Sequence, residues 1–228
     1  MLKHLFQSML PVCIGLSSFT AHAQICDRLA DEAFLSSASE SALETAITEE
    51  GANCIEGGFG SRRALDFAVE YDLPDLALKL LNRGARLDLP YVGGSNLLIE
   101  AVTAEASEDL IYILLKADLD PNASNNYGDT ALHWSVSPDI TARLIEAGGD
   151  VNATNNVGNT PLHAYVIDAR DYGFDTLEFS DMVATLVLAG ANLSIRNAEG
   201  QTAFELIQED DRLKGTDGYA LMKRGFSD

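Results

Sequence analysis

The side chains in this chain that are best suited to catalysis or metal binding are few and far apart. Its four histidines include His133 and His163, and neither of these has another histidine at the short spacing of a zinc-ligand pair. The glycine-rich stretch 57–60 is not followed by Lys-Ser or Lys-Thr, so it is a poor phosphate-binding loop. Carboxylates are so numerous that no particular pair stands out. We therefore predict no catalytic residue, no metal site and no cofactor.

The two histidines each close a phrase of turn and helix residues that recurs along the chain. The phrase occupies Asn126–His133, Asn156–His163 and Ala198–Glu205, and a second phrase of the type Leu144–Asn152 recurs in the same frame. Helix pairs of this kind must stack to bury their apolar faces. The period is marked by the apolar residue of the first phrase, at Leu65, Leu98, Leu132, Leu162 and Phe204, with steps of 33, 34, 30 and 42 residues.

Local chemistry explains several positions of the repeat. Thr130 and Thr160 stand where a hydroxyl group caps the start of a helix. Gly148 and its counterparts follow the second helix, where a left-handed backbone suits glycine better than a residue with Cβ. Asp118 replaces that glycine in one unit, so we predict a weaker cap there. The extra residues of the last long step fall near 167–180, and we predict that they form a surface loop between paired helices.

The chain resembles the ankyrin repeat family over about residues 38–208, most closely in the units that open at Asn126 and Asn156. The resemblance implies an all-α ankyrin-repeat solenoid of about five to six stacked helix-turn-helix units with short β-turn or hairpin loops. Arg63 and Asn96 depart from the family by replacing its threonine. We expect an N-terminal capping unit over 24–60, ankyrin repeats over 61–208 and a C-terminal capping segment over 209–228.

The resemblance also implies what the residues of each unit do. His133 and His163 are expected to hydrogen-bond to the threonine of their own phrase, as structural elements. The asparagines Asn122, Asn152 and Asn192 share one place in the repeat, so they reflect the fold rather than glycosylation. Ankyrin proteins recognise other proteins with hairpin tips and inner helices, which makes the contact candidates Tyr91, Asn125, Asn126, Tyr127, Trp134, Asn155, Asn156, Val157 and Tyr165. Trp134 could equally pack between repeats.

The extra segment near 167–180 supplies two further candidates. Tyr172 and Phe174 lie among carboxylates there, and exposed aromatic rings are common anchors at interfaces. The alternative is that both rings fold back onto the helices.

The start of the chain has the features of a secretory signal peptide. Lys3 precedes a mostly apolar stretch, and Ala21-His22-Ala23 offers a cleavage site, so residues 1–23 are expected to be removed near Ala23. Cys26 and Cys54 remain after cleavage. Export to an oxidising compartment favours a disulfide between them, the alternative being two free buried thiols. We expect a periplasmic or secreted protein.

Charge restricts the class of partner. The chain carries a formal net charge of −20, and between residues 94 and 199 it has 16 acidic and 4 basic residues. Nucleic acid and anionic lipid are disfavoured, and no apolar run is long enough for a membrane span. A partner protein with a basic surface fits this charge, although acidity could also serve solubility alone.

Together these features predict a non-enzymatic protein-protein interaction module, monomeric when unbound, that acts as an accessory or protective partner in the periplasm. The first alternative is an immunity or inhibitor protein that neutralises a toxic secreted enzyme. The alternative of another class is an enzyme with an unrecognised site.

Overall fold

The computed structural model describes residue 42 and residues 64–87, 94–173, 175–208 and 210–225. These residues form helices, turns and loops, with no strand among them. Several positions named from the sequence lie outside this part of the chain: the leader, the expected capping unit with Cys26 and Cys54, and the side chains of Tyr91 and Phe174.

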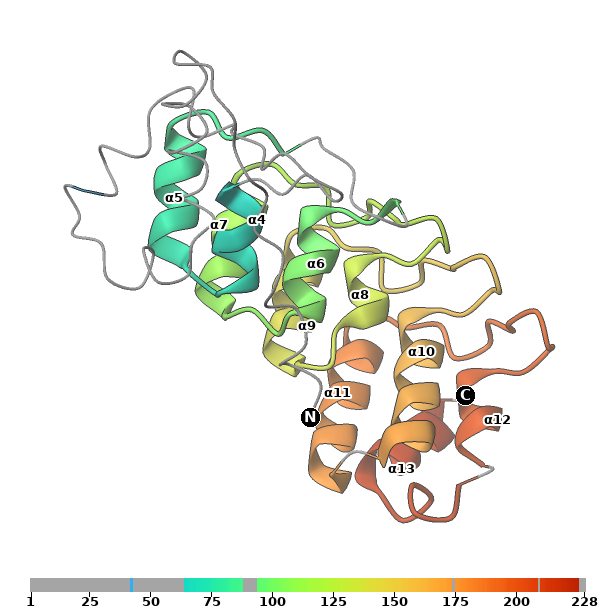
Figure 1. Cartoon of the computed structure of the whole chain (residues 1–228). Coiled ribbons are helices and arrows are strands. Elements are labelled where there is room, and N and C mark those ends of the chain that lie inside the picture. Colours follow the sequence, from blue (N-terminus) through green and yellow to red (C-terminus); the bar gives the residue numbers. More distant parts are fainter. Residues whose placement is uncertain (1–41, 43–63, 88–93, 174, 209, 226–228) are drawn as a thin grey trace, which may run out of the picture.

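The helices form two rows that run along the molecule (Figure 1). In the inner row α4, α6, α8, α10 and α12 each contact the next, and in the outer row α5, α7, α9, α11 and α13 do the same. The predicted pairing of helices is therefore confirmed for the described residues. The helices, with one π-helical turn η2, are α4 (Ala64–Glu70), α5 (Pro74–Asn82), α6 (Leu97–Thr103), α7 (Glu108–Lys116), α8 (Ala131–Trp134), α9 (Pro138–Glu146), α10 (Pro161–Asp168), η2 (Ala169–Gly173), α11 (Thr176–Leu188), α12 (Ala203–Ile207) and α13 (Asp217–Gly225).

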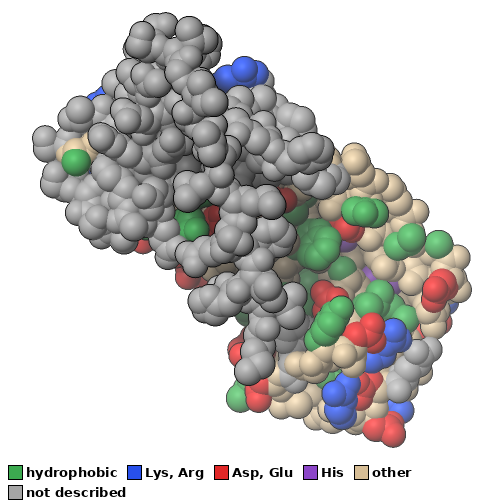
Figure 2. Space-filling model, viewed as in Figure 1, with side chains coloured by type: hydrophobic (Ala, Val, Ile, Leu, Met, Phe, Trp, Pro, Cys, Tyr) green, Lys and Arg blue, Asp and Glu red, His purple; other side chains and the backbone are tan. Residues whose placement is uncertain are grey.

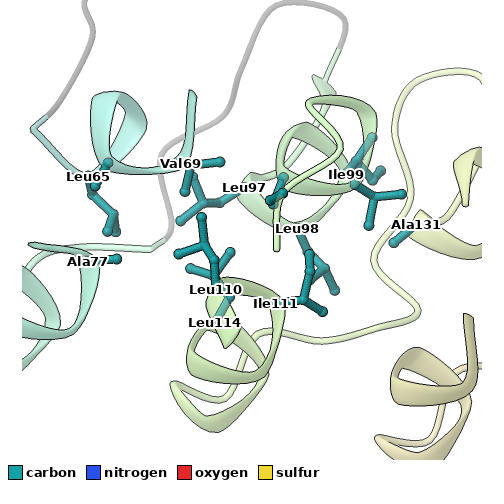
Figure 3. Packing of buried hydrophobic residues seen from close by; sticks show 14 of the residues in the cluster. Leu65, Val69, Ala77, Leu97, Leu98, Ile99, Leu110, Ile111, Leu114 and Ala131 are labelled. Atoms are coloured by element: carbon teal, nitrogen blue, oxygen red, sulfur yellow. The ribbon is translucent and has the colours of Figure 1, made fainter. Parts of the chain in front are cut away.

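The core lies between the two rows. Leu98 of the inner row and Leu110 and Leu114 of the outer row are almost fully buried and face one another (Figure 3). One buried cluster runs from α4 to α9 and a second from the loop after α9 to α13, and Ile145 packs against both. Each helix pair thus buries its apolar stripe against its neighbours, which a single pair could not do.

The predicted surface loop near 167–180 is wrong. The extra residues extend the helices instead: α10 continues into η2, and α11 has 13 residues where α5, α7 and α9 have nine. The longer α11 carries Phe179 and Val183, which are fully buried. Since these side chains would be exposed on a loop, hydrophobic burial favours the helical form.

The extended part of α11 also supports the C-terminal helix. Gly218 of α13 lies so close that an added Cβ would come within 3.1–3.2 Å of atoms of Phe179, Ser180 and Val183. Its N–H donates to the Ser180 hydroxyl at 3.2 Å. The extra residues are therefore part of the packing at this end of the molecule.

Candidate binding surface

The loop that precedes each inner helix is a tip held by an asparagine side chain. The Asn125 side-chain oxygen accepts from the N–H groups of Tyr127 at 2.8 Å and Asp129 at 3.0 Å. Asn155 and Asn197 repeat this pair of bonds at the next two tips. Such turns fix the backbone locally, because the side chain replaces a backbone acceptor. The residue two places after each asparagine is consequently presented at the apex.

Successive tips are also bonded to one another. The Asn156 N–H donates to the Tyr127 carbonyl at 2.9 Å, and the Ala198 N–H donates to the Val157 carbonyl at the same distance. Gly128 allows this approach because its φ is +79° and an added Cβ would lie 2.9 Å from the Asn156 nitrogen. The tips therefore form one continuous, hydrogen-bonded edge.

Three large hydrophobic side chains are exposed along this edge and the inner row. Tyr127 and Val157, at the apices of two tips, are 68% and 54% exposed, and Trp134 at the end of α8 is 44% exposed. Figure 2 shows hydrophobic side chains gathered over the region of α8 and on the loops beyond it. We call Tyr127, Trp134 and Val157 the tip surface. All three were contact candidates from the sequence.

Tyr165, another contact candidate from the sequence, is buried. The Tyr165 ring is only 3% exposed, stacks on Phe179 at 5.8 Å between ring centroids, and donates from its hydroxyl to the Glu178 carbonyl. Burial raises the pKa of this hydroxyl. The prediction that Tyr165 is a surface contact is therefore wrong. The helical extension that brings Phe179 alongside it is the cause.

The candidate asparagines contribute to the tips themselves. The Asn155 amide also donates to the Asp129 carboxylate at 2.7 Å, and the Asn156 amide donates to the Asn126 carbonyl at 2.9 Å. These bonds leave Asn125 and Asn155 as supports of the tip surface. Asn126 and Asn156 are exposed at the same edge.

Each histidine joins its own unit to the next. His133 Nδ1 lies 3.1 Å from the Thr130 nitrogen and 3.0 Å from its hydroxyl, and Nε2 lies 3.0 Å from the Asn159 carbonyl. His163 has the same arrangement with Thr160 and, through Nε2, with the Gln201 carbonyl at 3.2 Å. The predicted bond to threonine is confirmed. The bond to the following unit was not anticipated.

This geometry requires neutral imidazole rings. Since Nδ1 accepts from a backbone N–H, the proton is on Nε2, which donates to the carbonyl of the next unit. Burial lowers the pKa of His133 and of His163 from the usual value of 6.5. Both rings thus act as hydrogen-bond donors and acceptors that join neighbouring units.

Two departures from the repeat phrase, Asn96 in place of threonine and Glu205 in place of histidine, retain the helix cap with different side chains. Asn96, in the place of threonine, accepts from the N–H groups of Leu98 and Ile99 and donates to the Ala123 carbonyl of the next unit at 3.1 Å. It thus performs the capping of the threonine and the bridging of the histidine. Glu205 accepts from the Thr202 N–H at 2.9 Å, and Arg196 donates to its carboxylate at 2.6 and 3.1 Å.

The asparagines at the end of each unit form a second set of bridges. The Asn122 side chain donates to the Gly148 carbonyl at 2.9 Å and accepts from the Asp150 N–H at 2.7 Å. Asn152 makes the same two bonds with Gly190 and Asn192. A structural role explains why asparagine recurs at this place, as predicted for Asn122 and Asn152.

A hollow of about 300 Å³ lies on the outer row, between α7 and α9. Lys116 lies over the ring of Tyr112, with 5.3 Å between its ammonium nitrogen and the ring centroid, and Arg143 reaches Glu108 and Glu146 at 3.7 and 3.6 Å. The sequence did not single out this place, because its residues come from two units and share no motif. This hollow lies on the outer row of helices, whereas the tip surface lies on the inner row and its loops.

Within the described ranges, no three histidine, cysteine or acidic side chains are grouped so that they could hold a metal ion. None of the described helices has the length and apolar character needed to cross a membrane.

Two consecutive stretches of the chain, residues 127–156 and 157–198, match the family model of the ankyrin repeat. Residues 127–198 thus carry ankyrin repeats. None of the curated proteins compared with it matches it. The matched stretches contain the apices Tyr127 and Val157 and both bridging histidines, so the ankyrin units include the whole tip surface. Ankyrin repeats are a non-enzymatic interaction fold, which makes protein partners the class of ligand to expect.

Proposed function

We propose that the chain binds another protein through the tip surface and acts as its accessory or protective partner in the periplasm. The observation that carries the proposal is the exposure of Tyr127, Trp134 and Val157 on a hydrogen-bonded edge. Large hydrophobic side chains on a rigid support lose little conformational entropy on binding, which favours affinity. The bridges from His133 and His163 leave no free histidine for chemistry on this surface.

We further propose that the leader exports the protein and that processing occurs near Ala23. A Cys26–Cys54 disulfide then closes the N-terminal end, and the protein is monomeric before it binds its partner. Its helix pairs belong to one solenoid of five to six units. Protein recovered from the periplasm and unfolded without reductant should then show no titratable thiol, and two thiols would contradict the disulfide.

The expected partner has a basic surface. Acidic residues outnumber basic ones four to one between residues 94 and 199, which include the whole tip surface. If this charge steers association, the association rate should fall steeply with salt, because screening shortens the reach of charge to about 8 Å at physiological ionic strength. An association rate that is equal at low and high salt would leave the acidity as a solubility feature.

Capture from periplasmic extract tests the proposal. The double variant Y127S/W134S removes two exposed rings without altering a buried group, and L188S is the matched control, since Leu188 is 82% exposed on the outer row. We expect the natural protein and L188S to retain the same partner, identified by mass spectrometry, and Y127S/W134S to lose it. Equal capture by all three would refute the tip surface as the binding site. A captured enzyme whose activity falls on binding would assign the inhibitory role.

A further inference from the structure

The π-helical turn η2 is held in place by the segment that follows α12. The Arg170 carbonyl accepts from the Arg212 guanidinium at 2.9 Å, and Arg212 is itself paired with Asp210 at 3.0 Å. Ala169, the first residue of the turn, is buried. Turns of this kind are rare and are frequently found at functional sites. Here the turn connects two helices that already form part of the packed core, so it is an ordered feature of the surface.

The turn and the start of α11 expose two large hydrophobic side chains. Tyr172 is 83% exposed and Leu177 is 72% exposed, more than any residue of the tip surface. Asp175 caps α11 by accepting from the Leu177 N–H at 2.8 Å, which fixes the first turn of this helix. Tyr172 and Leu177 lie beyond the C-terminal end of α10, whereas the tips lie before its N-terminal end, about 12 Å away along the helix.

Carboxylates surround this apolar pair along the chain. Asp168, Asp171, Asp175 and Glu178 all lie between α10 and the first turn of α11, and Arg170 is the one basic residue among them. Arg170 donates to Asp171 at 3.1 Å. Burial, with the nearby Asp171 carboxylate, raises the pKa of Asp168. Arg212, which donates to the Arg170 carbonyl, is a second arginine at this turn and is paired with Asp210. Among the described residues of this region, five carboxylates, with Asp210 included, thus face two arginines.

We propose that Tyr172 and Leu177 form a second docking surface, which binds a basic and partly apolar segment of a partner protein. We call it the insertion surface, because it lies on the extra residues of the long unit. Apolar side chains of that segment would cover Leu177, and its lysine or arginine side chains would reach both the Tyr172 ring and the carboxylates. Charge complementarity selects this occupant, because the same carboxylates repel nucleic acid and anionic membranes. The surface is separate from the tip surface and does not depend on it.

The test is a fluorescence anisotropy titration of the full chain with a labelled dodecapeptide of alternating lysine and leucine. The double variant Y172S/L177S should weaken binding by at least about tenfold. L188S, which removes an exposed leucine from the other end of α11, and Y127S/W134S, which removes two rings of the tip surface, should leave the affinity for the peptide unchanged. D171N/D175N, in which asparagine retains the helix cap, should weaken binding and make it less dependent on salt.

Circular dichroism spectra and melting temperatures of all variants establish that they remain folded. Absence of peptide binding at about 50 mM salt, or equal affinity of Y172S/L177S and L188S, overturns the insertion surface. Binding of a peptide in which glutamate replaces lysine, with the same affinity, overturns the basic character of the occupant. None of these outcomes concerns capture through the tip surface, so the two proposals fail independently.

Discussion

The units with inner helices α8 and α10 differ in length by more than a third, yet each is joined to its neighbour by the same bonds. Leu132, Leu162 and Phe204 mark steps of 30 and 42 residues. His133 reaches a carbonyl 26 residues ahead, and His163 reaches the corresponding carbonyl 38 residues ahead. Asn122 and Asn152 likewise bridge 26 and 38 residues to equivalent carbonyls.

The difference in length is absorbed away from the tips. In the short unit α8 has four residues and ends at Trp134. The next residue, Ser135, has an extended backbone, and Ser137 is the N-cap of α9. In the long unit the inner helix continues into η2, and the outer helix gains residues at its start. Because the bridges involve the start of the inner helix and the end of the outer helix, the region between these two places can change without breaking them.

The short and the long unit also differ in the contacts that close the turn between their two helices. In the short unit the Thr141 hydroxyl donates to the buried Ser135 hydroxyl at 2.8 Å, so a polar contact closes the turn between helices. In the long unit Phe179, Val183 and Gly218 close the same side with apolar contacts. The longer unit thereby supports α13, which the shorter unit does not contact closely.

The largest effect should come from removing the side chain on which the long unit depends. Phe179→Ala leaves a cavity beside Tyr165 and should lower the free energy of unfolding by about 3–5 kcal/mol. Hydrogen exchange should show faster exchange in α13 and the first turns of α11 than in α8 and α9. Leu144→Ala, in the short unit, is the control, and uniform acceleration in both variants would show that the two units unfold together.

A second effect concerns the histidine bridges, which should respond to pH alike in both units. Their folded-state pKa values lie below 6.5, so the unfolded chain binds more protons, and stability should fall as pH decreases from about 6.5. His133→Gln and His163→Gln should each lower stability at pH 7.5 by about 1–3 kcal/mol and reduce the slope between pH 7 and pH 5.5. Denaturant unfolding at several pH values measures this. A slope that persists in the double variant would assign it to other groups.

A smaller effect tests whether the Asn122 and Asn152 bridges contribute equally to stability, although the units that they span differ in length. Asn122→Ala and Asn152→Ala each remove one donor and one acceptor on the surface, and each should lower stability by about 1 kcal/mol. Chemical denaturation of the two variants gives the comparison directly. A clearly larger loss for Asn152→Ala would show that the long unit strains its bridge.

The smallest effect concerns the cap before the short unit. Asp118 has φ of +63°, where the corresponding Gly148 has φ of +97° and open space around its missing Cβ. Asp118→Gly should therefore raise the free energy of unfolding by about 0.5–1 kcal/mol, and Gly148→Ala should lower it by a similar amount. Thermal melts of both variants check the sign. Destabilisation by Asp118→Gly would indicate that the aspartate side chain contributes more than its backbone strain costs.

The amino-acid sequence alone determined the features that depend on near neighbours in the chain. Thr160 and His163 are three residues apart, and Asn155 binds N–H groups two and four residues ahead. Such bonds follow from local backbone geometry, so the repeated phrases predicted helix pairs and capped starts, and the ankyrin resemblance implied the histidine contact. The exposed apices Tyr127 and Val157 also follow, because each tip repeats the same turn.

Tertiary structure decided what depends on residues far apart. Whether the long segment would be a loop or a helix depended on its burial against α13, which begins 44 residues after Gly173. Tyr165 is buried because Phe179 lies beside it, and η2 is fixed because Arg212 reaches Arg170 across 42 residues. The hollow between α7 and α9 likewise exists only once two units are stacked. Periodicity cannot specify these features, because they depend on side chains that only the stacking of units brings together.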